Sequence, residues 1–201
     1  MTLPNKLTML RILLIPVMVI IYYIPWFKEN DIFLNISWLY FILFIIFSLA
    51  SLTDMLDGKI ARKYNLVTTF GKFADPLADK LLVFTALTML MLNPVGVLVN
   101  MGDLYIQMVP MWAFIIILIR EFMVSGIRMV AASNGQVIAA AKLGKIKTAF
   151  TMIAIIICFF AEAHNVVAVI GYFSIMIATL LTIVSGIEYF WKNRAIILES
   201  I

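Results

Sequence analysis

Six long runs of apolar residues, separated by short polar segments, dominate the chain. A helix needs about 20 consecutive apolar residues to cross the hydrocarbon core of a bilayer. The pattern therefore predicts an all-α polytopic membrane protein with six transmembrane helices. The predicted spans cover residues 7–24, 33–56, 73–92, 108–130, 145–163 and 166–191.

The composition supports a membrane protein. Hydrophobic residues make up 64% of the 201 residues, and the mean hydropathy is +1.08. Soluble domains are about 45–50% apolar, so a water-soluble fold of this size could not bury the excess. No internal repeat or linker divides the chain, and residues 1–201 are expected to form one membrane domain. No small-residue cleavage site follows the first apolar run, which is therefore expected to remain as a membrane helix.

The basic residues predict the orientation of the helices, because lysine and arginine gather in cytoplasmic loops. With the N-terminus in the cytoplasm, the loop 93–107, which has no Lys or Arg, lies outside. Lys28 is then the one basic residue expected outside, and Arg120 lies within the fourth span. Six spans bring the C-terminus back to the cytoplasm. The net charge of +4 then reflects cytoplasmic loops and anionic lipid headgroups, and no nucleic-acid partner is expected.

An acidic stretch lies where the second run ends and the third begins. Asp54 and Asp57 are three residues apart, and Asp75 and Asp79 are four apart. On helices, both spacings place the two side chains on one face. The loop between the two runs is short, so the helices are expected to be antiparallel neighbours. Four carboxylates would then meet at the cytoplasmic edge of the membrane, where they need paired or bound cations.

Divalent cations are the predicted partners of these aspartates. Carboxylate oxygens suit Mg²⁺, Mn²⁺ or Ca²⁺, and the lack of nearby Cys or His argues against zinc. Two divalent ions bridged by shared carboxylates are typical of phosphoryl chemistry. Gly58 and Gly71 would let a phosphate or nucleotide approach the backbone, and Arg62 would supply a forked cation. The alternative is that the aspartates are helix caps and solvated interfacial charges, paired with Lys59, Arg62, Lys63 and Lys72.

These residues resemble the signature of the CDP-alcohol phosphatidyltransferase family, D-x2-D-G-x2-A-R-x8-G-x3-D-x3-D. The eight-residue spacer 63–70 has the family's length. Every fixed position is matched, by Asp54, Asp57, Gly58, Ala61, Arg62, Gly71, Asp75 and Asp79. The resemblance implies a six-span membrane enzyme, commonly a homodimer. Such an enzyme would transfer a phosphatidyl group from CDP-diacylglycerol to an alcohol and release CMP.

The resemblance also implies roles for individual residues. Asp79 would be the base that deprotonates the acceptor hydroxyl. The two divalent cations, Mg²⁺ or Mn²⁺, would be held by Asp54, Asp57, Asp75 and Asp79. An N-terminal segment with Asn5, Thr8 and Arg11 is similar to the part of the family fold that closes over the nucleotide. The predicted CDP-diacylglycerol-binding residues are Asn5, Thr8, Gly58, Ala61, Arg62, Thr68 and Gly71.

A basic set in the later part of the chain indicates the class of acceptor. Arg120 and Arg128 share one face of the fourth predicted helix, and Lys142, Lys145 and Lys147 surround the start of the fifth. An arginine inside a membrane helix normally faces the protein interior or a polar cavity. Such a site would bind an anion and favours an acceptor that carries its own phosphate. The lysines can alternatively be explained as anchors at the cytoplasmic interface.

Glu121 is not expected to be the direct partner of Arg120, because consecutive helical side chains point about 100° apart. The segments R-E-F-M-V-S-G-I-R and K-L-G-K-I-K-T resemble those of bacterial phosphatidylglycerophosphate synthases within the family. That resemblance implies sn-glycerol 3-phosphate as the acceptor and phosphatidylglycerol phosphate as the product. The predicted acceptor-binding residues are Arg120, Arg128, Lys142 and Lys145.

Two alternatives remain open. The acceptor could be inositol phosphate, or phosphatidylglycerol as in a cardiolipin synthase. More remotely, the four aspartates could form the ion site of a divalent-cation transporter. Transporters usually place such sites near the bilayer midplane between repeats, whereas these aspartates lie at the membrane edge and no repeat is visible. The expected location is the inner or plasma membrane, with the active site facing the cytoplasm.

Overall fold

The computed structural model describes residues 3–63, 69–92, 98–101, 104–133, 138 and 142–194. These residues contain seven α-helices, one short 3₁₀ helix and two β-hairpins. The helices are α1 (Leu3–Tyr23), α2 (Pro25–Glu29), α3 (Trp38–Lys63), α4 (Thr69–Leu92), α5 (Met111–Ser133), α6 (Lys142–Phe159) and α7 (Asn165–Lys192), with η1 (Ala161–Ala163) between the last two. The antiparallel hairpins pair β1 (Asp31–Phe33) with β2 (Ile36–Ser37) and β3 (Leu98–Met101) with β4 (Leu104–Gln107).

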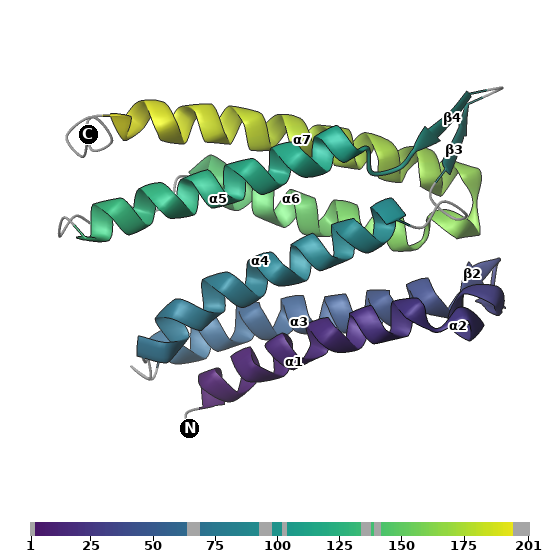
Figure 1. The fold of residues 1–201 in the computed structure, drawn as a ribbon, viewed down its shortest axis with the longest axis horizontal. Helices are drawn as coiled ribbons and strands as arrows, with labels where there is room; N and C mark the ends of the chain where they lie inside the picture. Colours follow the sequence, from purple (N-terminus) through teal and green to yellow (C-terminus); the bar gives the residue numbers. More distant parts are fainter. Residues whose placement is uncertain are drawn as a thin grey trace.

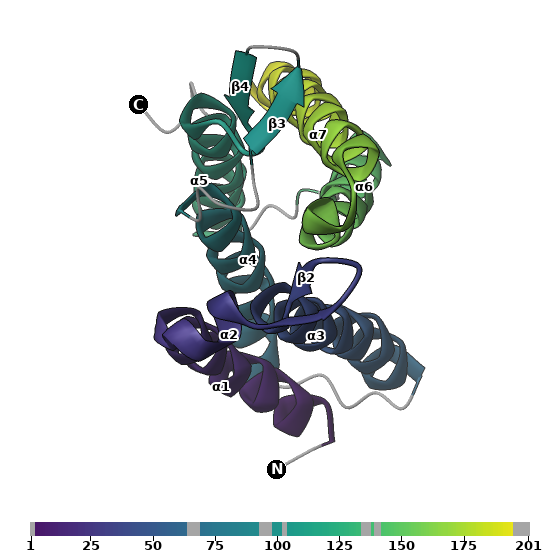
Figure 2. The ribbon, with the colours of Figure 1, turned by 90° about the vertical axis from the view of Figure 1, so that its right-hand side faces the viewer.

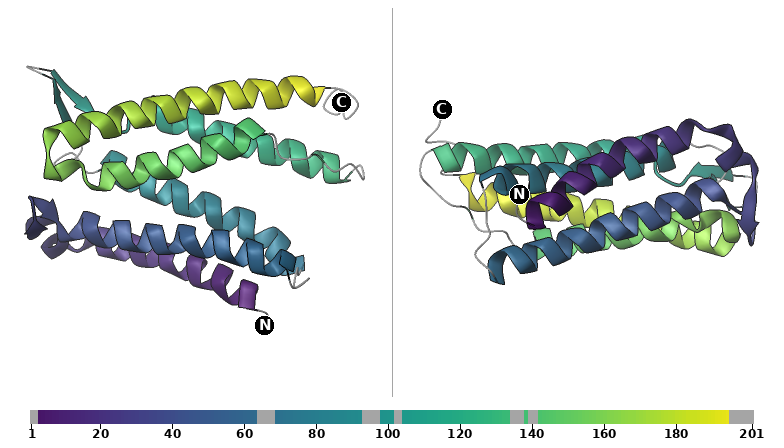
Figure 3. Two further views of the ribbon diagram at one scale, coloured as in Figure 1. Left: turned by 180° about the vertical axis from the view of Figure 1, so that it is seen from behind. Right: turned by 90° about the horizontal axis from the view of Figure 1, so that it is seen from below.

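The six long helices run along the length of the molecule (Figure 1). Seen from one end, α1, α3 and α4 form one group, and α5, α6 and α7 form a second (Figure 2). Helix α4 joins the groups, since it contacts α1 and α3 as well as α5 and α6. The start of α1 and the ends of α3, α5 and α7 lie at one end of the bundle, and both hairpins lie at the other (Figure 3).

The all-α prediction is confirmed, and each long helix overlaps one of the six predicted spans. Among the described residues, three helical segments are long and apolar enough to cross a membrane: Asn5–Tyr23, Leu143–Ala163 and Asn165–Lys192. A shorter apolar helix covers Trp38–Asp54. Helix α3 continues beyond it as far as Lys63, so it carries the signature aspartates Asp54 and Asp57 at the end opposite the hairpins.

The start of the second predicted span was wrong. Phe33 lies in strand β1, and α3 begins five residues later at Trp38. Leu34 and Asn35 form the turn between β1 and β2 with φ values of 51° and 58°. Two successive positive φ values are typical of a tight two-residue hairpin and cannot continue a right-handed helix. Hydrophobicity alone does not separate a short apolar strand from the start of a helix.

The core lies along the contact of α3 with α4 and α6. Phe47 of α3 meets Phe159 of α6 edge to face, with ring centroids 5.9 Å apart. Helices α6 and α7 approach closely at Gly171, where a β-carbon would lie 3.2 Å from the Cys158 sulfur. Small residues allow such close approach between helices in membranes. The packing therefore positions α6 firmly between α3 and α7.

A polar contact joins the two helix groups at the hairpin end. The backbone N–H of Ser37 in β2 donates to Oε2 of Glu162 in η1 over 2.8 Å. The next helix begins immediately afterwards, where Nδ1 of His164 accepts from the backbone N–H of Val166 at 3.1 Å. Both contacts satisfy backbone donors at the edge of an element. The bond from Ser37 to Glu162 links the two groups at the hairpin end, opposite the aspartates, whereas the His164 contact caps the start of α7.

Candidate active site

Both aspartate pairs lie on helices, as predicted. Asp54 and Asp57 belong to α3, whereas Asp75 and Asp79 belong to the first half of α4. The two helices are in contact and run in opposite directions (Figure 1). The side chain of Asp57 lies outside the described part of the structure. The pairs nevertheless come from the two helix segments that face each other at the end of the bundle opposite the hairpins.

Helix α1 contacts both pairs. Arg11 Nη1 donates a 2.8 Å hydrogen bond to Asp54 Oδ1, and the Thr8 hydroxyl donates to Asp75 Oδ1. The Arg11 side chain is fully buried, whereas 37% of the Asp54 side chain is exposed. Asn5 is half-buried and lies one turn before Thr8 on the same helix. Thr8 and Arg11 therefore contact two of the signature aspartates, and Asn5 lies one turn away on the same helix.

The donor set fits a hard divalent cation. Asp54, Asp75 and Asp79 offer carboxylate oxygens, the ligands that Mg²⁺ and Mn²⁺ prefer. Asp79 also interacts electrostatically with Asp54, so the two helices bring like charges within reach of each other. Among the described side chains, no three acidic, His or Cys residues converge tightly enough to coordinate a metal. That search does not include the side chain of Asp57, the fourth member of the predicted set.

The structure describes only some of the predicted CDP-diacylglycerol-binding residues. Thr68 lies outside the described residues. Gly58, Ala61 and Arg62 belong to the last turns of α3, but the surroundings of these positions lie outside the described part. Gly71 is buried near the start of α4. The positions of these helices place all of these residues, except Thr68, at the same end of the bundle as Asp54.

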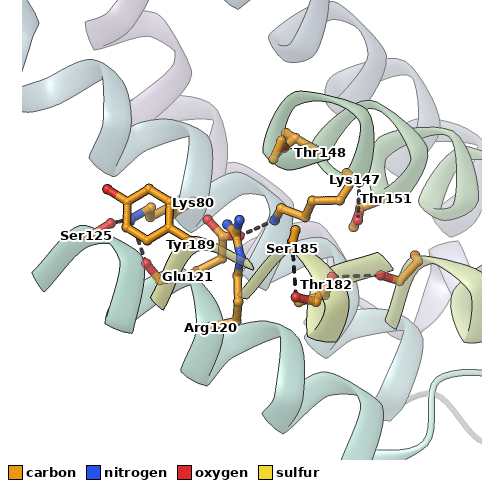
Figure 4. A network of polar contacts seen from close by, with 12 residues as sticks. Lys80, Arg120, Glu121, Ser125, Lys147, Thr148, Thr151, Thr182, Ser185 and Tyr189 are labelled. Carbon is orange, nitrogen blue, oxygen red and sulfur yellow. Dashed lines mark hydrogen bonds and ion pairs between the residues drawn. The ribbon is translucent and has the colours of Figure 1, made fainter. Parts of the chain in front are cut away.

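A second polar network lies beside the aspartates, on α4, α5 and α6 (Figure 4). Its centre is Glu121 of α5, whose Oε1 accepts from Arg120 Nη1 at 3.0 Å and from Lys147 Nζ of α6. Lys80 Nζ of α4 donates to the backbone oxygen of Glu121 at 3.2 Å and to the Ser125 hydroxyl. The Arg120, Glu121 and Lys147 side chains are only 12%, 17% and 5% exposed. We call Lys80, Arg120, Glu121 and Lys147 the basic network.

The expectation that Glu121 is not a direct partner of Arg120 was wrong. The Arg120 side chain is long enough to turn towards the carboxylate of its neighbour, although their Cβ atoms point in different directions. Lys80 and Glu121 were not among the predicted site residues. Their presence as charges within apolar runs was the available signal, because such residues in membrane helices usually face the bundle interior.

The other predicted acceptor-site residues lie in different surroundings. Arg128 Nε donates to the Tyr189 hydroxyl at 3.3 Å, and its guanidinium lies 5.7 Å from the centre of that ring. Lys145 is exposed, and the side chain of Lys142 lies outside the described part. Lys147 is the buried member of that lysine group, and it joins Arg120 at Glu121.

A small cavity lies where Asp79 meets three members of the basic network. It has a volume of about 20 Å³, and its polar walls include Asp79, Lys80, Glu121 and Lys147. Such a volume has room for about one water molecule. The charges that act on Asp79 are those of Asp54 and Arg11 from the acidic site and those of Glu121 and Lys147 from the basic network. Asp79 is therefore shared by the acidic site and the basic network.

Comparisons with known proteins identify the family of this chain. The family model for CDP-alcohol phosphatidyltransferase matches residues 1–184. A CDP-diacylglycerol–glycerol-3-phosphate 3-phosphatidyltransferase of Bacillus subtilis is 42% identical over 198 residues, covering 95% of this chain and 94% of the relative. Proteins of the same name from Rickettsia typhi and Shigella flexneri are 37% and 30% identical, covering 94% and 98% of this chain and 94% and 97% of their own lengths. The chain therefore belongs to the CDP-alcohol phosphatidyltransferase family.

Proposed function

We propose that this protein transfers a phosphatidyl group from CDP-diacylglycerol to sn-glycerol 3-phosphate, giving phosphatidylglycerol phosphate and CMP. The observation that carries this proposal is the position of Asp79 between the signature aspartates and the basic network. The acidic side suits a donor diphosphate with its cations, and the basic side suits an anionic acceptor. Relatives named for this reaction align over nearly the whole chain.

The acidic side binds the donor in this proposal. Two divalent cations, Mg²⁺ or Mn²⁺, would be held by Asp54, Asp57, Asp75 and Asp79. When bound, they would neutralise the diphosphate and the departing CMP. Arg11 and Thr8 hold α1 against the aspartates. In this proposal α1 covers the nucleotide of the bound donor. The donor contacts are Asn5, Thr8, Gly58, Ala61, Arg62, Thr68 and Gly71.

The basic side binds the acceptor. A phosphate monoester carries a charge of about −1.5 to −2 at neutral pH. Lys80, Arg120 and Lys147 surround Glu121, whose carboxylate offsets one of their three positive charges, and Asp79 and the acceptor phosphate share the excess. Arg128, Lys142 and Lys145 extend the basic surface on α5 and α6. Neutral or zwitterionic alcohols would leave this buried excess of charge uncompensated.

Asp79 is the general base in this scheme. It accepts the proton of the primary hydroxyl of glycerol 3-phosphate, and that oxygen attacks the lipid-linked phosphorus. The bond between this phosphorus and the CMP oxygen breaks, and CMP leaves. With the donor on one side of Asp79 and the acceptor phosphate on the other, most of the rate enhancement comes from positioning and electrostatic stabilisation.

In this proposal the six long helices cross the inner or plasma membrane of the cell. Both termini and the active site face the cytoplasm. The distribution of Lys and Arg supports this orientation. The helix ends that carry the aspartates share one end of the bundle with the start of α1 and the end of α7 (Figure 1). Donor and product keep their acyl chains in the bilayer. We propose a homodimer, as the family resemblance implies.

An acceptor assay tests the function. Purified protein is incubated with CDP-diacylglycerol, Mg²⁺ and one acceptor at a time, and the release of CMP is measured. We expect release with glycerol 3-phosphate and none with inositol phosphate or phosphatidylglycerol, and chelation of divalent ions should stop it. Release with inositol phosphate but not with glycerol 3-phosphate would show that the acceptor is misassigned. Metal uptake into liposomes without any CMP release would instead favour a transporter.

A further inference from the structure

Two cations from different helices meet at one carboxylate oxygen. Arg120 of α5 and Lys147 of α6 both donate to Oε1 of Glu121. Like charges at such short range repel strongly in a site that excludes water. Glu121 offsets this repulsion, because it attracts both groups to the same atom. It therefore determines how far apart the two side-chain donors lie and in which direction they point (Figure 4).

Two glycines of neighbouring helices lie along the Arg120 side chain. A β-carbon on Gly186 of α7 would lie 3.1 Å from Arg120 Cγ, and one on Gly144 of α6 would lie 3.5 Å from Arg120 Nη2. Both neighbours lack a side chain at the points where the arginine passes. The arginine therefore passes close to both glycine positions, and its guanidinium donates to Glu121.

The negative charge of Glu121 is unfavourable for a site that must bind an anion. Judged by long-range electrostatics alone, replacing it with a neutral residue would strengthen phosphate binding. A carboxylate at this position must then contribute through geometry. A guanidinium and an ammonium group at a fixed separation can donate to two oxygens of one phosphate, whereas two mobile cations lose conformational entropy on binding.

We propose that Glu121 is a positioning residue of the acceptor site, which holds Arg120 and Lys147 at the separation needed to bind one phosphate group together. This inference rests on the proposed function. It assigns the phosphate of the acceptor to the Arg120–Lys147 pair, with Lys80 adding charge from α4. Glu121 itself does not touch the acceptor; it acts through the two cations that it holds.

The test compares Glu121→Gln and Glu121→Asp with a matched control, Glu188→Gln. Glu188 forms a separate ion pair with Lys192 on α7. For Glu121→Gln, the KM for glycerol 3-phosphate should rise about tenfold or more, the equivalent of one charge-assisted hydrogen bond. The kcat and the KM for CDP-diacylglycerol should stay within about twofold. Glu121→Asp keeps the charge and should recover part of the acceptor affinity, and Glu188→Gln should behave as wild type.

A binding measurement without turnover separates this inference from the proposed function. Thermal stabilisation by glycerol 3-phosphate alone should be present in the wild type and much reduced in Glu121→Gln. If the wild type releases CMP with glycerol 3-phosphate but Glu121→Gln has an unchanged or lower KM for it, Glu121 only balances charge and the inference fails. If the wild type releases no CMP with this acceptor, the proposed function fails instead.

A double substitution tests whether Glu121 acts through Lys147. Lys147→Met alone should raise the acceptor KM strongly. In the Glu121→Gln background it should add little, because Lys147 has already lost its position. Multiplicative effects of the two substitutions would show that they act independently and would overturn the inference. If Glu121→Gln lowers the melting temperature so far that kinetics cannot be measured, the same comparison is made with Glu121→Asp.

Discussion

Arg11 and Asp54, 43 positions apart in the chain, are joined by a 2.8 Å hydrogen bond from Nη1 to Oδ1. The arginine side chain is fully buried, and the aspartate is partly open to solvent. A buried guanidinium is stable only with an anionic partner. Helix α1 therefore supplies one positive charge to the acidic site from within the protein, at a carboxylate that the proposed function also assigns to a divalent cation.

Replacing Arg11 should change how the protein responds to divalent ions. Arg11→Met should lower the free energy of unfolding by about 1.5–3 kcal/mol, the contribution of a hydrogen bond to a charged group. Mg²⁺ should then stabilise the variant more than the wild type, because Asp54 no longer has its internal cation. Thermal unfolding in detergent, with Mg²⁺ or with a chelator, measures both effects. Lys6→Met is the control, because Lys6 is exposed on the same helix. If Mg²⁺ stabilises wild type and Arg11→Met equally, Arg11 does not substitute for a divalent cation at Asp54.

Replacing Asp79 should stop turnover and leave donor binding intact. Asparagine has the same shape as aspartate but cannot accept the proton of the acceptor hydroxyl. Loss of a general base typically costs about 10²- to 10⁴-fold in rate. Release of CMP and binding of labelled CDP-diacylglycerol are measured on the same preparation. Asp31→Asn, in the hairpin at the other end of the bundle, serves as the control. Activity close to wild type in Asp79→Asn would remove Asp79 as the base.

Replacing Arg120 should affect the acceptor far more than the donor. Arg120→Ala removes a side chain that donates hydrogen bonds to the acceptor phosphate in the proposed function. Glu121 keeps Lys147 as its side-chain ion-pair partner. The KM for glycerol 3-phosphate should rise about tenfold or more, as expected for a lost charge-assisted contact. Steady-state kinetics with each substrate varied in turn measures the two KM values. Arg194→Ala is a suitable control, since Arg194 is exposed and stacks on Trp191. Equal increases for both substrates would indicate a role in folding instead.

A β-carbon at Gly186 should disturb Arg120 without weakening the fold. It would lie 3.1 Å from Arg120 Cγ, so the arginine has to shift by a few tenths of an ångström. Alanine also favours a helix over glycine by about 0.5–1 kcal/mol. Gly186→Ala should therefore raise the acceptor KM while the melting temperature stays equal or rises. Gly126→Ala on α5 is the matched control, because a β-carbon there meets nothing within 4 Å. The same change in KM from both substitutions would exclude the steric explanation.

The parts of the site that depend on local spacing could be predicted from the sequence. The intervals between Asp54 and Asp57 and between Asp75 and Asp79 are helical, and both pairs lie on helices. The apolar runs likewise predicted the long helices. The prediction failed at the start of the second span, where a short apolar segment that includes Phe33 forms a strand and not the first turn of a helix.

Contacts that depend on how separate helices pack against each other could not be predicted from the sequence. Lys145 and Lys147 are two residues apart and so lie on nearly opposite faces of a helix, but the sequence pattern does not say which of the two faces is buried. The packing of α6 against its neighbours leaves Lys145 exposed and buries Lys147 beside Glu121. The ion pair of Arg120 with Glu121 depends on side-chain rotamers, which helical periodicity does not describe.

Asp79 and Lys80 are consecutive residues of α4, and one faces the aspartates while the other binds the backbone of Glu121. A helix fixes the rise and rotation between neighbouring residues at 1.5 Å and about 100°. The distance from the proposed base to Lys80, the cation that α4 contributes to the basic network, is therefore set by a rigid helix, with no loop between them. In the proposed reaction α4 thus fixes the base relative to one of the charges that the acceptor meets, and the packing of α5 and α6 against α4 sets how far the hydroxyl of the alcohol can lie from its phosphate.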